Sequence, residues 1–144
     1  MTDLYVASPT GSGRVAQWMS EAIGHFQAGR LQEADTLSRR MAEAEPGNAE
    51  IFNLWAAVVL QGGQPEAAAQ LLARAIELKG GQREYHHNLG NVLRGLGRLD
   101  EAAACFQNSL RLEPQAVDSA FELGLTLLEL GRPLEAAPLF KAAV

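Results

Sequence analysis

The chain repeats itself every 34 residues, and this period constrains its fold more than any other feature. Glycine and alanine recur in one register four times, at Gly29, Gly63, Gly97 and Gly131 and at Ala34, Ala68, Ala102 and Ala136. The register divides the chain into units 15–48, 49–82, 83–116 and 117–144. Residues 1–14 precede the first unit, are rich in glycine, serine and threonine, and are expected to form a flexible leader.

The third unit shows the pattern within each repeat. Apolar residues recur at steps of three and four from Tyr85 to Leu96 and again from Leu99 to Leu112, which predicts two amphipathic helices. Gly97 separates the helices, because glycine accepts a left-handed turn, and Pro114 ends the second one. Four such units predict an all-α fold of about eight helices, arranged as antiparallel pairs.

Small residues occupy fixed places on both helices of each predicted pair. The second helices carry Ala34, Ala68, Ala102 and Ala136, and the first helices carry Ala22, Ala56, Gly90 and Gly124. A larger side chain at either place would push the two backbones apart. The small residues therefore predict that the two helices of each pair cross closely.

Several residues of the third unit resemble the signature of the tetratricopeptide repeat, whose period is also 34 residues. They are Leu89-Gly90, Gly97, Glu101-Ala102, Phe106 and Pro114. The resemblance covers residues 15–144, although Glu21 stands in the first unit where Trp55, Leu89 and Leu123 supply an apolar residue. It implies an α-solenoid, a right-handed superhelix of antiparallel helix pairs, whose partners are proteins or peptides.

In this family the first helix of each pair lines a concave groove that holds a peptide or a helix of a partner. The resemblance places the following residues there: Asn53, His87, Asn88, Asn91, Arg94, Phe121, Leu125 and Leu128. For Phe121 and Leu125 the alternative is packing against the next helix, and for Arg94 it is a solvated charge. Family members that grip chaperone C-termini use a basic clamp, whose positions here hold Met19, Glu84 and Asn88, so that ligand is not expected.

Composition and motifs exclude several other functions. The net charge of −5 argues against a nucleic-acid surface, and no run of about 20 apolar residues could span a membrane. His86 and His87 point about 100° apart on a helix, so they do not form a metal site. The single cysteine, Cys105, permits no internal disulfide, which favours a reducing, cytoplasmic location. Neither catalysis nor a cofactor or metal is expected.

The last predicted helix carries an unusual apolar surface. Terminal repeats normally present a polar outer face, but this helix contains Leu134, Leu139 and Phe140. We expect a longer parent chain or a partner at this surface, including a homodimer. Two functions follow: an interaction scaffold, or the N-terminal arm of a larger bacterial enzyme, such as a glycosyltransferase or sulfotransferase, that recruits its substrate.

Overall fold

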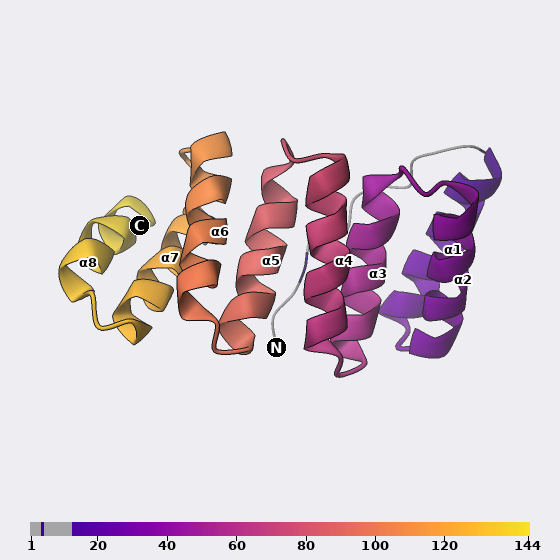
Figure 1. Cartoon of the computed structure of the whole chain (residues 1–144), viewed down its shortest axis with the longest axis horizontal. Helices are drawn as coiled ribbons and strands as arrows, with labels where there is room; N and C mark the ends of the chain where they lie inside the picture. Colours follow the sequence, from indigo (N-terminus) through magenta and orange to yellow (C-terminus); the bar gives the residue numbers. More distant parts are fainter. Residues whose placement is uncertain (1–3, 5–12) are drawn as a thin grey trace. The chain divides into compact units, whose positions relative to one another are not determined.

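The computed structural model describes residue 4 and residues 13–144, and within them it contains eight α-helices and no strand (Figure 1). The helices are α1 (Gly13–Gln27), α2 (Leu31–Ala44), α3 (Ala49–Gln61), α4 (Pro65–Leu78), α5 (Arg83–Gly95), α6 (Leu99–Leu112), α7 (Val117–Glu129) and α8 (Pro133–Ala142). The all-α prediction is therefore confirmed. Most of the expected leader lies outside the described residues, and its last two residues, Gly13 and Arg14, belong to α1.

The helix boundaries follow the 34-residue period of the sequence. The second, third and fourth pairs begin at Ala49, Arg83 and Val117, which are the predicted first residues of their units. Pro65 and Pro133 begin α4 and α8, where the missing N–H of proline would have no helical partner. None of the helices in the part described is long and apolar enough to cross a membrane.

Four glycines make the turns inside the pairs. Gly29, Gly63, Gly97 and Gly131 have φ between 75° and 82°, a left-handed conformation that only glycine adopts without strain. After α5, the Gly97 N–H donates to Arg94 O at 3.0 Å and the Arg98 N–H donates to Leu93 O at 2.9 Å. These two bonds form a Schellman motif, so the glycine turn both ends α5 and satisfies its last carbonyl groups.

The helices form two compact units, one that contains α1–α4 and ends at Gly80 and one that spans Gly81–Val144 with α5–α8. Within each unit consecutive helices pack on each other, and the first helices also touch, α1 on α3 and α5 on α7. In the first unit a core cluster of α1, α2 and α3 contains Val15, Met19, Ala22, Ala34, Met41, Ile51, Leu54 and Val58. The α5–α8 core contains Leu93, Ala102, Ala103, Phe106, Leu123, Leu127 and Ala136.

The predicted small residues are buried, and the structure gives a more specific reason for two of them. A Cβ on Gly90 would lie 2.7 Å from the Phe106 ring, and one on Gly124 would lie 2.8 Å from the Phe140 ring. In the second unit the same two register positions hold Ala56 and Leu72. The glycines therefore make room for an aromatic ring from the second helix, in addition to letting the backbones approach.

Candidate partner-binding site

The predicted groove residues differ in how far they reach the solvent. Phe121 and Leu128 of α7 are each 46% exposed, while Leu125 and Arg94 are partly buried. The buried members of the set are Asn53, His87, Asn88 and Asn91, and the side chain of Asn88 is wholly covered. The candidate site therefore consists of accessible residues of α5 and α7, two helices that lie in one unit and touch each other.

An apolar stripe runs along α7. Phe121, Leu125 and Leu128 follow each other at steps of four and three, so they share one face of the helix. The Phe121 ring meets Phe140 of α8 edge-on, with the ring centres 5.7 Å apart. Phe140 in turn lies over Gly124. The contact with Phe140 fixes the orientation of the Phe121 ring, while almost half of its surface stays exposed. Phe121 is therefore a rigid apolar anchor.

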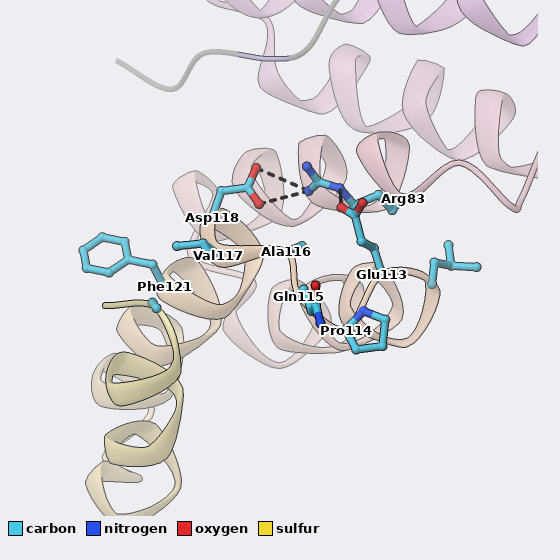
Figure 2. Close-up of a pocket in the computed structure, with 10 residues that line it drawn as sticks. Arg83, Glu113, Pro114, Gln115, Ala116, Val117, Asp118 and Phe121 are labelled. Atoms are coloured by element: carbon cyan, nitrogen blue, oxygen red, sulfur yellow. Dashed lines mark hydrogen bonds and ion pairs between the residues drawn. The ribbon is translucent and has the colours of Figure 1, made fainter.

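An open pocket lies at the first turn of α7 (Figure 2). Its volume is about 940 Å³, and it is lined by Arg83, by the connection from Leu112 to Asp118, by Phe121 and by Ala143. Figure 2 shows Phe121 at one side of the pocket and the Arg83–Asp118 pair at another. The pocket thus combines an apolar wall with a charged one, the composition that orients an amphipathic side chain.

Two arginines of α5 each bind two carboxylates. Arg83 Nε lies 2.6 Å from Glu113 Oε2, and its Nη1 donates to Asp118 Oδ1 at 3.0 Å. About three turns further along the same helix, Arg94 donates to Glu122 Oε2 at 2.7 Å and to Glu129 Oε1 at 2.6 Å. Four carboxylates surround two guanidinium groups, so the local charge beside the apolar stripe is negative.

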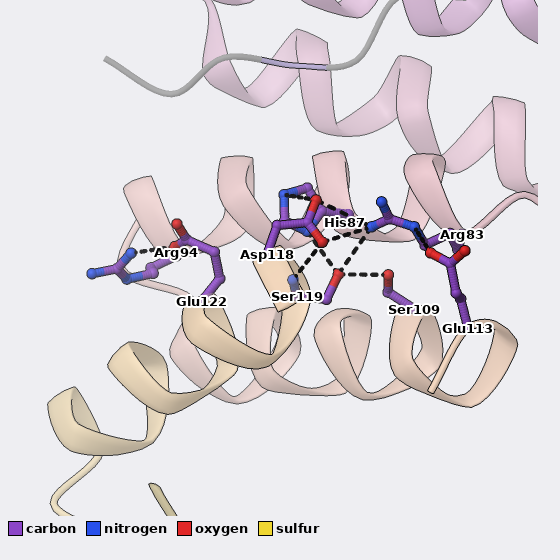
Figure 3. A network of polar contacts seen from close by, with 8 residues as sticks. All are labelled: Arg83, His87, Arg94, Ser109, Glu113, Asp118, Ser119 and Glu122. Atoms are coloured by element: carbon purple, nitrogen blue, oxygen red, sulfur yellow. Dashed lines mark hydrogen bonds and ion pairs between the residues drawn. The ribbon is translucent and has the colours of Figure 1, made fainter. Parts of the chain in front are cut away.

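A buried polar network ties α5, α6 and α7 together below these ion pairs (Figure 3). His87 Nδ1 lies 2.8 Å from Ser119 Oγ, and Ser119 Oγ lies 2.7 Å from Ser109 Oγ. The His87 ring also meets Phe106 edge-on at 5.6 Å. His87, expected in the groove, is buried and joins the helices in the structure.

Ser109 and Ser119 were not predicted as site residues, although the repeat held a signal for both. The position of Ser109 is occupied by Ala75 in the second unit. The position of Ser119 is occupied by Tyr85 in the third unit and by Ile51 in the second. Both serines are wholly buried. A polar residue at a position that is apolar in the neighbouring repeats needs a hydrogen-bond partner, and that departure could have been read from the sequence.

Burial lowers the pKa of His87 below its ordinary value of 6.5, because the imidazolium loses its hydration. The positive charge of Arg83 lowers the pKa further, whereas the carboxylates of Asp118, Glu122 and Glu84 oppose this shift. His87 is therefore neutral at pH 7, with one ring nitrogen as donor and the other as acceptor.

We expect the free energy of unfolding to fall as the pH is lowered from about 7.5 to about 5.5, because the unfolded chain binds a proton on His87 before the folded chain does. Denaturant unfolding at several pH values measures this slope. His87→Gln should flatten it, because this variant has no titrating group at the position. Equal slopes for His87→Gln and the parent would contradict the prediction.

The single thiol of the chain is protonated at neutral pH, and the described residues hold no cluster of metal ligands. Cys105 is half-buried, and burial raises the pKa of its thiol to about 11, so it is not a thiolate at neutral pH. No group of three or more His, Cys, Asp or Glu side chains within residues 13–144 is placed to hold a metal ion.

On α8, Leu134 is 90% exposed, whereas Leu139 and Phe140 pack against the α5–α8 core.

Two sequence models of the tetratricopeptide repeat match the chain, one at residues 25–90 and one at residues 87–144. No curated protein sequence shows a significant match.

Solved structures share the fold. A crystal structure of MamA superimposes with a TM-score of 0.83 at 21% identity, covering 88% of this chain and 74% of that one. MamA AMB-1 gives 0.78 at 25% identity, over 89% and 70%. YrrB, described as a TPR protein with an unusual peptide-binding site, gives 0.78 at 23% identity, over 89% and 66%.

Proposed function

The chain belongs to the tetratricopeptide repeat family, and from this premise we propose that it is a non-catalytic module that binds partner proteins through the accessible face of α5 and α7. The observation that supports this site best is the apolar stripe of Phe121, Leu125 and Leu128, of which two members are nearly half exposed. Large apolar side chains exposed side by side are typical of interaction surfaces. Peptide binding by YrrB, a protein of similar fold, agrees with this function.

The charges beside the stripe determine the chemistry of the partner. Arg83 and Arg94 are outnumbered by the carboxylates of Glu113, Asp118, Glu122 and Glu129. A segment that carries apolar residues together with lysine or arginine would fill the stripe and neutralise this excess. The proposal covers a separate scaffold and a recruiting arm of a larger enzyme, because both need the same contact.

A cytoplasmic location is part of the same proposal. The one cysteine cannot form a disulfide within the chain, and its thiol is half-buried. Proteins without disulfides are the rule in reducing compartments.

The test is selection of binders from a random peptide library, followed by measurement of the dissociation constant of the best peptide. We expect selected peptides to be rich in apolar and basic residues, and we expect Phe121→Ala with Leu128→Ala to weaken binding at least about tenfold, since exposed anchors dominate such interfaces. Raised salt should weaken binding further. Circular dichroism must show unchanged helicity in the variant.

Leu134→Ala is the matched control, because it removes an exposed leucine from α8. Binding that survives Leu134→Ala but not the α7 variant supports the proposed face. Binding that survives the α7 variant would exclude that face. A loss confined to Leu134→Ala, or a dimer that this change dissociates, would instead favour the surface of α8.

A further inference from the structure

Three arginines of the α1–α4 unit stack on the only two tryptophans of the chain. Arg14 Cζ lies 5.4 Å and Arg40 Cζ lies 4.6 Å from the centre of the Trp18 ring. Arg39 Cζ lies 5.5 Å from the centre of the Trp55 ring. Cations at these distances are attracted by the electrons of the aromatic ring. The two guanidinium groups on Trp18 come from different helices, α1 and α2, so the fold brings them together.

The arginines beside the two tryptophans differ in whether a carboxylate pairs with them. Arg39 binds Asp35 at 3.2 Å, and the same carboxylate accepts a 2.7 Å hydrogen bond from Trp55 Nε1. Among the residues that the structure describes, neither Arg14 nor Arg40 has a carboxylate within 4 Å. Both side chains are exposed. Trp18 therefore carries two guanidinium groups that form no ion pair with an acidic residue of the described part.

The two positive charges lie close enough to act on one ligand. Their distances to the Trp18 ring keep the two Cζ atoms within about 10 Å of each other, which is about one Debye length at 0.1 M salt. A guanidinium that lies over a ring keeps its N–H donors for other acceptors, and its fork fits a carboxylate with two hydrogen bonds. Trp18 is partly exposed and adds an apolar contact.

We propose that Arg14, Trp18 and Arg40 form a second contact site, which binds an acidic segment of a partner protein. Charge complementarity favours an anionic occupant here, in contrast to the carboxylate-rich face of α5 and α7. A short acidic protein segment is favoured over nucleic acid, because two arginines bind only a few anionic groups, and the chain, with a net charge of −5, would repel a long polyanion beyond the site. The site lies in the α1–α4 unit, whereas the α7 stripe lies in the other unit, so each site can be tested independently of the other.

The fluorescence of Trp18 tests this site directly. In a Trp55→Phe background Trp18 is the only tryptophan, and capped octaglutamate is the probe. We expect a saturable change in emission that Arg14→Gln with Arg40→Gln weakens at least about tenfold, since two charge-assisted contacts are lost. Arg111→Gln, which removes an exposed arginine from α6, should leave binding unchanged, as should Phe121→Ala with Leu128→Ala.

Three results would overturn the proposal. The first is no saturable change with octaglutamate, and the second is equal affinity in the Arg14→Gln, Arg40→Gln variant. The third is equal or tighter binding of an oligothymidylate of the same length, which would assign the site to nucleic acid. Arg14→Lys with Arg40→Lys keeps both charges and protects the test against a folding defect. Lysine lacks the guanidinium fork, so this variant should bind octaglutamate more weakly than the parent but more tightly than the Arg14→Gln, Arg40→Gln variant.

Discussion

Phe106→Ala is expected to lower the free energy of unfolding by about 3–5 kcal/mol, the range for removing a large aromatic side chain from a packed core. Phe106 has no exposed surface and belongs to the α5–α8 core. Its ring covers Gly90 and meets the ring of His87. Removing it would leave a cavity bounded by a helix backbone, which cannot collapse without shifting α5 against α6.

Equilibrium unfolding in denaturant, followed by circular dichroism, measures this loss. Phe121→Ala is the matched control, because it removes the same ring from a site that is 46% exposed. Phe121→Ala removes an edge-on contact with Phe140, which is worth about 0.5–1.5 kcal/mol beyond the buried area, and the area that Phe121 buries is smaller than that of Phe106. Equal losses for the two variants would show that Phe106 is not the centre of this core.

Gly90→Ala is expected to destabilise the protein by about 1–3 kcal/mol, the typical cost of overpacking a core. Helix propensity alone predicts the opposite, since alanine is favoured over glycine inside a helix by about 1 kcal/mol. Steric conflict outweighs propensity here, because the new Cβ would lie 2.7–2.9 Å from three atoms of the Phe106 ring.

A double-mutant cycle separates this conflict from other effects of the substitution. In a Phe106→Leu background the penalty of Gly90→Ala should disappear, because the second repeat already holds Ala56 and Leu72 at these register positions. Gly95→Ala, in the same helix, has no atom within 4 Å of its new Cβ and should be neutral or stabilising. Additive effects of the two changes in the cycle would contradict the packing of Phe106 on Gly90.

Much of the fold could be predicted from the sequence, because the period encodes local structure four times over. Gly97 marks a left-handed turn and Pro114 follows the end of a helix, and both act through backbone geometry that needs no distant partner. The glycine recurs four times in one register, which fixed the number of helix pairs, whereas the proline recurs only at Pro46.

The candidate site was less predictable, because a repeat shows what its units share and binding depends on where they differ. Asn53 and Asn88 occupy positions that the resemblance assigns to a groove, yet both are buried. Ser119 joins His87 and Ser109 through contacts between three helices. Burial of this kind depends on the side chains that cover a position, and those come from other segments of the chain.

The sequence by itself determined that this chain forms antiparallel helix pairs, since turn chemistry and apolar periodicity are local properties. Only the tertiary structure decided which residues are accessible. It placed Phe121 over Phe140, where the ring stays half exposed, and it placed Arg14 and Arg40 on the Trp18 ring. Accessibility and charge balance arise between helices, because a side chain is covered or neutralised only by neighbours that the fold brings to it.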